Sequence, residues 1–249
     1  MENELPWHDD DNLWQSLAPA LFTQQRWADT PVEVEQVIST LDIEAGAHIL
    51  DLCCGVGRHS LELARRGFKV TGVDRTQAYL DSASHQAEQE GLVVEFIQDD
   101  MRTYRSLGAF DAVINLFTSF GYFEDPEEDR RVVMNVYHSL KPGGAFLLQM
   151  IGKEILARIY RERDWYEEEG VLVLQERELA RNWGWIENRW IIIDQGRRTD
   201  FYLAHRIYSA MELTSLLSGC GFAQVAVYGD LEGSLYDHQA RMLVAVAHK

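Results

Sequence analysis

The chain has 249 residues, 46% of them hydrophobic and 25% charged, which is the composition of a globular protein with one sizeable core. Its formal net charge is -17, from 23 basic and 40 acidic side chains, and this argues against the basic surface that a nucleic-acid partner normally requires. No apolar run reaches the roughly 18 residues of a membrane span. The acidic start, MENELPWHDDDNLW, lacks the basic and apolar regions of a secretory signal.

Three cysteines form an odd set, and two of them, Cys53 and Cys54, are adjacent in one apolar segment. Cys220 stands far from both. This pattern suits reduced thiols in a cytoplasmic protein better than a disulfide framework. Because no spaced pair of Cys or His accompanies them, we expect no metal site.

The first 42 residues predict a helical cap, residues 1–42. Apolar residues recur at helical spacing between positions 11 and 29. Thr30-Pro-Val-Glu33 then has the form of a capping box with proline at the first helical position. We therefore expect a helix to start at Thr30 and to end near Leu41.

The next segment, residues 43–152, alternates between strand and helix patterns, which is typical of a parallel sheet with right-handed crossovers. Lys141-Pro-Gly-Gly144 predicts a turn before the last strand of this segment. The expected strands are residues 47–51, 68–73, 93–97, 110–116 and 145–150, and the expected helices are residues 59–66, 77–90 and 126–140.

The alternation of strand and helix patterns ends at Met150. Two or three antiparallel strands are expected at residues 171–179, 185–193 and 200–208, inside a β-rich insertion spanning residues 153–208. Residues 209–249 then complete the main sheet with a helix near 211–218, a strand at 223–228 and a last, antiparallel strand at 241–247. The sequence predicts a single α/β domain, 1–249, with a doubly wound, mostly parallel seven-stranded sheet and a small antiparallel insertion.

A glycine-rich loop follows the first predicted strand, in the sequence DLCCGVGRHS that begins at Asp51. Gly55 and Gly57 allow a tight turn and the close approach of a ligand to the backbone. Amide groups at the start of the next helix would face that ligand. A short glycine pattern is weak evidence on its own, because packing alone often explains such turns.

Acidic residues end the next two strands. Asp74 follows the second strand, where a carboxylate can accept hydrogen bonds from both hydroxyls of a ribose. Asp99, Asp100 and Met101 follow the third, where an acid can bind an adenine amino group and the methionine can pack on the ring. Any one of these acids alone is better explained as a helix N-cap or a loop residue. With Asp51 at the end of the first strand, the chain has an acid at the carboxyl end of each of three successive strands, and this arrangement favours a nucleoside site.

With these motifs the chain resembles the class I S-adenosylmethionine-dependent methyltransferases, closely over residues 30–150 and more loosely over the last 40. The resemblance implies a Rossmann-like fold and S-adenosylmethionine as cofactor. In that family an acid-x-Gly-x-Gly-x-Gly loop holds the methionine part of the cofactor, and here Cys53 replaces the first glycine. The implied cofactor residues are Asp51, Cys53, Gly55, Gly57, Asp74, Arg75, Asp100, Met101, Asn115 and Leu116.

A dinucleotide dehydrogenase is the main alternative for the same glycine loop. Asp74 suits either cofactor and does not discriminate. Ser60 stands where the dehydrogenase pattern has its third glycine, an acid precedes the glycines, and no second dinucleotide-binding half is evident. These three observations favour the methyltransferase interpretation.

The acceptor of the methyl group is not encoded in a recognisable motif. The segment NLFTSFGYF, residues 115–123, matches a family segment that borders the acceptor, so Tyr122 is our candidate for the methyl-transfer pocket. No catalytic base is identified, and the connection at 229–239 is expected to overhang the site. The substrate candidates are Phe117, Phe120, Tyr122, Arg206, Tyr208 and Arg241.

The insertion carries five aromatic residues that could form a lid over a small acceptor or an interface in a homo-oligomer, although packing within the domain is the commonest use of such residues. These are Trp165, Tyr166, Trp183, Trp185 and Trp190. The sequence predicts methyl transfer to an N, O or C atom of a small molecule. A non-catalytic S-adenosylmethionine sensor, or an enzyme acting on protein or tRNA, remains an alternative.

Overall fold

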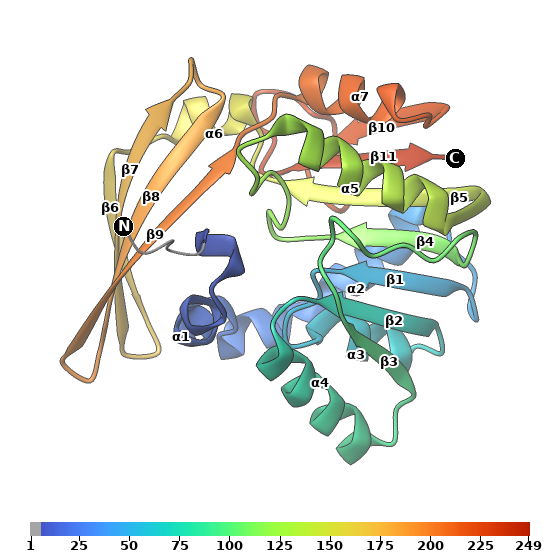
Figure 1. The fold of residues 1–249 in the computed structure, drawn as a ribbon, viewed down its shortest axis with the longest axis horizontal. Coiled ribbons are helices and arrows are strands. Elements are labelled where there is room, and N and C mark those ends of the chain that lie inside the picture. Colours follow the sequence, from blue (N-terminus) through green and yellow to red (C-terminus); the bar gives the residue numbers. More distant parts are fainter. Residues whose placement is uncertain (1–5) are drawn as a thin grey trace.

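The computed structural model describes residues 6–249; residues 1–5, part of the helical cap predicted for residues 1–42, lie outside the described residues. A seven-stranded sheet forms its centre, made of β1 (His48–Leu52), β2 (Lys69–Asp74), β3 (Val94–Gln98), β4 (Phe110–Asn115), β5 (Leu140–Met150), β10 (Gln224–Tyr228) and β11 (Leu243–His248). The strand order is β10-β11-β5-β4-β1-β2-β3 (Figure 1). Strand β11 runs antiparallel to both of its neighbours, β5 and β10, and the other six strands run parallel to one another, which confirms the predicted fold class.

Helices cover both faces of this sheet. On one face lie α2 (Gln24–Leu41) and α3 (Arg58–Arg65), and on the other lie α5 (Pro126–Ser139) and α7 (Ala210–Gly219). Alternate residues of each strand serve the two layers: Ile49 packs with the α2 side, whereas Leu50 and Leu52 pack with the α5 side. Helix α4 (Gln77–Glu90) packs against β2 and β3 and ends at Gly91, as predicted.

The predicted helix start at Thr30 is wrong. Helix α2 begins at Gln24, and the N-cap is Thr23, whose side chain accepts a hydrogen bond from the Arg26 amide. Pro31 lies inside the helix. Thr30 is buried and its hydroxyl donates to the Arg26 carbonyl one turn back, at 2.7 Å. The local capping-box pattern was therefore overridden by packing of a longer helix.

The turn predicted at Lys141–Gly144 also differs, because β5 already begins at Leu140 and includes these residues. The pairing of β4 with β5 is irregular there: Phe110 pairs with Leu140, but Ala112 pairs with Ala145. The extra residues form a bulge in β5, with Gly143 at a φ of 79°.

The insertion contains more regular structure than the sequence predicted. Helix α6 (Lys153–Ile159) is followed by four strands, β6 (Arg163–Glu168), β7 (Val171–Ala180), β8 (Trp185–Asp194) and β9 (Arg197–Arg206), in an antiparallel sheet of order β6-β7-β8-β9. Strand β6 and helix α6 were not predicted. Tyr208 was placed in the last of these strands, but it lies beyond the end of β9.

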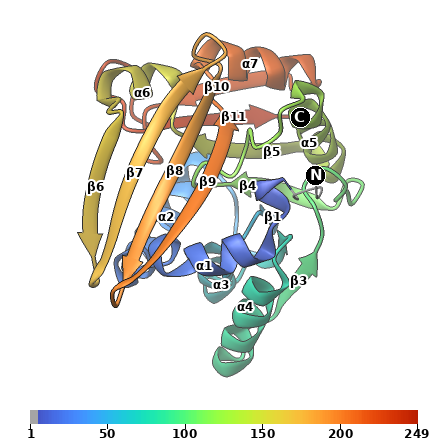
Figure 2. The same ribbon diagram turned by 60° about the vertical axis from the view of Figure 1, so that its left-hand side comes forward.

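The N-terminal segment lies between the two sheets (Figures 1 and 2). It consists of the 3₁₀ helix η1 (Trp7–Asp9) and α1 (Asp11–Leu21), which is capped by the Asp10 side chain. Leu17 and Ala20 of α1 pack against Val173, Ile192 and Phe201 of the four-stranded sheet. Helix α1 thus fills the space between the insertion and the carboxyl ends of the parallel strands.

Two features are absent from residues 6–249. None of the helices in this part of the chain has the length and apolar character needed to cross a membrane. No group of three or more His, Cys, Asp or Glu side chains among the same residues is arranged to hold a metal ion.

We predict that Thr23→Ala lowers the free energy of unfolding by about 1 kcal/mol, because it removes the N-cap of α2. Urea denaturation measures the change. Ser218→Ala, in the exposed last turn of α7, is the control and should change stability by less than about 0.5 kcal/mol. Equal losses in the two variants would contradict the assignment of Thr23 as the cap.

Candidate active site

A cavity lies at the carboxyl ends of β1, β2, β3 and β4, where an open parallel sheet normally binds its ligand. The glycine loop after β1 forms its floor. Residues following β2, β3 and β4 form its walls, and residues from η1, α1 and the start of α2 cover it. The cavity therefore brings together segments that are far apart in the sequence.

The glycine loop has an unusual backbone. Gly55 and Gly57 have φ values of 56° and 74°, in the left-handed region that other residues rarely adopt. A Cβ added to Gly57 would approach Ala83 to 2.9 Å, and one added to Gly55 would approach Phe22 to the same distance. Cys53, in the place of the family's first glycine, also has a positive φ, of 64°. The local conformation thus suits a glycine at this position too.

Asp74 lies at the end of β2, beside the glycine loop. One carboxylate oxygen accepts a hydrogen bond from the Gly55 amide at 2.8 Å, and the other accepts one from the Thr76 amide at 2.9 Å. No ion pair to Asp74 exists in the part of the chain that the structure describes, and burial raises the pKa of this carboxyl group. A carboxylate on a cavity wall with no cation beside it is well suited to accept hydrogen bonds from the hydroxyls of a ligand.

Asp51 is the deeper of the two acids, with a side chain that is almost fully buried. The Ser60 hydroxyl donates to it at 2.6 Å, and burial raises the pKa of its carboxyl group. Ser60, which counted against a dehydrogenase, therefore fixes the orientation of the first acid of the motif.

Asp100 and Met101 follow β3, as expected, on another wall of the cavity. Burial raises the pKa of Asp100, but hydrogen bonds from Arg102 outweigh it and the pKa is lowered overall. Met101 is buried, and its sulfur lies 3.7 Å from the Cys53 sulfur. This wall offers an apolar surface next to an ionised carboxylate.

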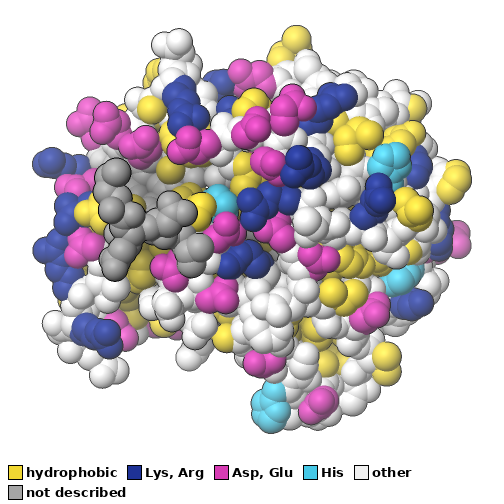
Figure 3. Space-filling view, in the orientation of Figure 1, with side chains coloured by type: hydrophobic (Ala, Val, Ile, Leu, Met, Phe, Trp, Pro, Cys, Tyr) yellow, Lys and Arg dark blue, Asp and Glu magenta, His cyan; other side chains and the backbone are white. Residues whose placement is uncertain are grey.

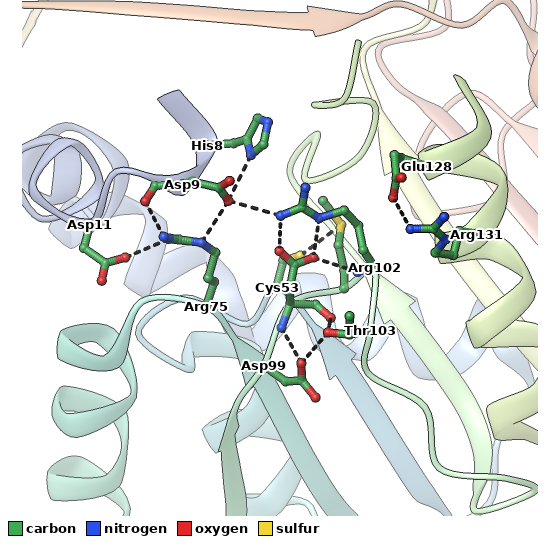
Figure 4. Close-up of polar contacts among 12 residues, drawn as sticks. His8, Asp9, Asp11, Cys53, Arg75, Asp99, Arg102, Thr103, Glu128 and Arg131 are labelled. Atoms are coloured by element: carbon green, nitrogen blue, oxygen red, sulfur yellow. Dashed lines mark hydrogen bonds and ion pairs between the residues drawn. The ribbon is translucent and has the colours of Figure 1, made fainter. Parts of the chain in front are cut away.

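Asp9 of η1 joins the N-terminal segment to the same wall (Figure 4). Its carboxylate lies 3.2 Å from both Arg75 and Arg102, and Asp11 pairs with Arg75 at 2.9 Å. Arg75, predicted to contact the cofactor, thus binds the cover of the cavity. Six cavity-lining residues of the cover were not predicted from the sequence, because only their long-range contacts reveal them: His8, Asp9, Trp14, Leu21, Phe22 and Arg26.

The segment after β4 forms the remaining wall. Asn115 donates to the carbonyls of Leu52 and Ser119, at 3.0 and 3.2 Å, and so links this segment to β1. Its side-chain oxygen is buried and accepts no hydrogen bond within the described residues. Leu116 is buried beside it. Phe117 lines the cavity, with the guanidinium groups of Arg26 and Arg58 over its ring, at 5.6 and 4.9 Å from the centroid.

Tyr122 lines the cavity and packs against the cover. Its ring centroid lies 4.9 Å from that of Trp7 and 6.0 Å from that of Trp14. Burial raises the pKa of the Tyr122 phenol, which therefore stays neutral. In the cover, burial lowers the pKa of His8, whose Nδ1 lies 3.2 Å from the Asp9 carboxylate.

The other substrate candidates do not line this cavity. Phe120 is fully buried in the core and packs against Tyr208, at 5.7 Å between ring centroids. Tyr208 and Arg206 both bind Asp129. Arg241 pairs with Asp230 at the surface, in the connection expected to overhang the site, and this connection contributes nothing to the lining.

We predict that Cys53→Gly is more stable than Cys53→Ala by about 1 kcal/mol, because a Cβ is unfavourable at the left-handed backbone conformation of residue 53. Both variants lose the contact of the Cys53 sulfur with Met101, so their difference isolates the backbone effect. Thermal unfolding of the pair measures it. A Cys53→Ala variant as stable as Cys53→Gly would show that residue 53 adopts an ordinary conformation.

Comparison with known proteins is consistent with this site. Residues 49–144, from β1 to the bulge in β5, match the family model of a methyltransferase domain. A protein of Geobacillus sp. (strain WCH70), provisionally named a methyltransferase, is 29% identical over 129 residues. The aligned segment is 52% of this chain and 52% of that protein, so it spans about half the length of the relative.

Solved structures share the whole fold. A S-adenosylmethionine-dependent methyltransferase from Clostridium acetobutylicum ATCC 824 superposes with a TM-score of 0.74 and 18% identity, covering 95% of this chain and 96% of that one. The sugar N-methyltransferase KedS8 from Streptoalloteichus sp. ATCC 53650 superposes with a TM-score of 0.69 and 22% identity, covering 92% of each chain. Residues 49–144 thus form a methyltransferase domain, and the whole chain has the fold of S-adenosylmethionine-dependent methyltransferase structures.

Proposed function

We propose that the protein moves the methyl group of S-adenosylmethionine to an N, O or C atom of a small molecule. The observation that carries this proposal is the position of Asp74 and Tyr122 on the walls of one cavity that η1 and α1 cover. A covered cavity suits an acceptor small enough to enter it. The name of KedS8, a sugar N-methyltransferase with a similar fold, supports the same class of acceptor.

The residues present fit the cofactor. Asp74 would accept hydrogen bonds from the ribose hydroxyls, and Asp100 with Met101 would hold the adenine. The amides of the glycine loop and the guanidinium group of Arg26 would face the methionine carboxylate, since Arg26 lines the cavity and has no carboxylate partner among residues 6–249. The side-chain oxygen of Asn115, left without a donor, would add a polar contact at the loop.

When bound, the cofactor supplies an activated methyl group, so the chain has only to align an acceptor and exclude water. Tyr122 would orient the acceptor through its neutral phenol. Trp7 and Trp14, which pack on Tyr122, would keep water out. His8 could take up a proton released during transfer, because its lowered pKa keeps the imidazole neutral.

A second, open cavity lies between the N-terminal segment and the four-stranded sheet. Trp7 lines this cavity, while Trp14 and Tyr122 line the first, so these three packed rings form a shared wall. We propose that the acceptor approaches through the second cavity and that the insertion acts as part of its binding site. The alternative use of the insertion, as the interface of a homo-oligomer, also stays a proposal.

No specific observation favours tRNA or protein as the acceptor. Lys and Arg side chains on the face drawn in Figure 3 are interspersed with Asp and Glu, without the basic stripe that binds phosphates. A non-catalytic S-adenosylmethionine sensor would share the cofactor residues and differ only in turnover.

We predict that isothermal titration with S-adenosylhomocysteine shows binding by the wild-type protein and that Asp74→Ala weakens it by about tenfold or more, because hydrogen bonds to a charged group are lost. Asp81→Ala, an acid on the exposed side of α4, is the matched control and should bind like the wild type. A folded wild-type protein that binds neither S-adenosylhomocysteine nor S-adenosylmethionine would remove the proposed cofactor site.

We predict that incubation with S-adenosylmethionine labelled in its methyl group and a fractionated cell extract labels the small-molecule fraction. The same reaction should label neither the protein nor the tRNA fraction. Label in one of the macromolecular fractions would overturn the acceptor class. Binding of the cofactor without label in any fraction would favour a sensor.

A further inference from the structure

The segment 116–124, called the acceptor loop below, has a strained backbone. Phe117 and Thr118 have φ values of 57° and 58°, and Gly121 has a φ of 89°. Two consecutive non-glycine residues in the left-handed region are costly and persist only where surrounding structure holds them. The loop therefore needs anchors outside itself.

The first anchor is Gln149 of β5, a buried residue of the central sheet. Its side-chain oxygen accepts a hydrogen bond from the Phe117 amide at 3.2 Å, and its carbonyl accepts one from the Thr118 amide at 3.1 Å. The Thr118 hydroxyl in turn accepts a hydrogen bond from the Ile151 amide at 3.3 Å. These contacts fix only the first half of the acceptor loop.

The second anchor is Arg206, the last residue of β9 and therefore part of the insertion. Its amide donates to the Gly121 carbonyl at 2.7 Å. Its guanidinium group donates to the carbonyls of Phe123 and Glu124, at 3.3 and 2.8 Å. A Cβ at Gly121 would lie 2.8 Å from the Arg206 carbonyl, so backbone and loop are in close contact.

Asp129 holds this arginine in place. Its side chain is fully buried in the first turn of α5, and it accepts hydrogen bonds from Arg206 Nε at 3.2 Å and from the Tyr208 hydroxyl at 2.7 Å. Removing one partner of such a buried pair is strongly unfavourable, because the remaining charge has no compensation. Asp129, in a helix that packs on the seven-stranded sheet, therefore fixes the position of the Arg206 side chain.

We propose that Arg206 is a positioning residue through which the insertion fixes Tyr122 in the acceptor site. Of the loop residues that line the cavity, Ser119 lies between the Gln149 and Arg206 anchors, and Tyr122 lies between Gly121 and Phe123, whose carbonyls both accept hydrogen bonds from Arg206. Arg206 itself does not line the cavity, so it acts through the loop and not on a ligand. The proposal rests on the proposed function, because the role of Tyr122 in binding the acceptor is part of that function.

The test uses the full chain labelled with 5-fluorotryptophan. The ¹⁹F resonances of Trp7 and Trp14, assigned by single Trp→Phe variants, report the packing of the Tyr122 ring against them. In Arg206→Ala both resonances should shift or broaden, and the amides of residues 119–123 should exchange with solvent about tenfold faster. Arg206→Lys keeps the charge but loses the fork that reaches two carbonyls, and should give a smaller change in the same direction.

Arg181→Ala is the matched control. The Arg181 guanidinium also lies over the Trp185 ring, at 4.7 Å against 5.8 Å for Arg206, and pairs with the side chain of Glu124 at 3.3 Å. It has no contact with the carbonyls of the acceptor loop among the described residues. Arg181→Ala should therefore leave the ¹⁹F resonances and the loop amides unchanged.

Gly121→Ala disturbs the same contact from the acceptor loop and should give the same ¹⁹F change. It serves as the test if Arg206→Ala does not fold. Unchanged resonances and exchange in folded Arg206→Ala, or equal changes in Arg181→Ala, would overturn the proposal. The spectra are recorded without ligand, and each variant is titrated separately with S-adenosylhomocysteine. Failure of the wild-type protein to bind it would remove the proposed function while leaving the loop measurement valid.

Discussion

The structure of the site depends on one hydrogen bond between two neighbouring strands. The Gly55 amide, in the turn after β1, donates to the carboxylate of Asp74 at the end of β2. Gly55 and Gly57 both adopt left-handed backbone conformations in this turn, which glycine does without steric cost. Asp74 has no ion pair among residues 6–249, so its carboxylate is available to the hydrogen-bond donors of a ligand. The two motifs that carry the resemblance to methyltransferases are thus one physical unit.

The other walls of the cavity come from parts of the chain that this unit does not position. Asp9 attaches the cover to two of these walls, because its carboxylate pairs with Arg75 and Arg102. Arg75 is next to Asp74 in the sequence, and Arg102 is next to Met101. Helix α1 then packs its apolar side against the four-stranded sheet. The insertion therefore contacts the site in two places. Its sheet packs against α1, and its Arg206 donates hydrogen bonds to the acceptor loop.

Sequence patterns predicted the elements whose signals are local. Helix α4 was predicted with its exact bounds, because Gly91 supplies a clear C-cap and the preceding residues have helical spacing. Strand β6, with the sequence RDWYEE, was missed because charged residues interrupt its alternation. Thr30 and Thr23 both precede helix-forming residues, and only tertiary packing decides that the helix starts at the earlier one.

Much of the cavity wall was predictable for the same reason, since Asp51 and Gly55, Asp74, and Met101 lie at the carboxyl ends of three successive strands, β1, β2 and β3. His8, Trp14 and Arg26 could not be predicted, because their place depends on how the N-terminal segment folds back across the sheet. Arg206 was expected near the acceptor, but sequence alone does not show that its side chain points toward Asp129.

The cover has consequences for the rate at which molecules enter and leave the cavity. It is held by ion pairs at η1 and by apolar packing of α1, two kinds of contact that respond to different conditions. Salt screens the partly exposed ion pairs of Asp9, whereas apolar packing changes with temperature. Ligand exchange that requires both η1 and α1 to detach would be slower when α1 packs more tightly and faster at higher ionic strength.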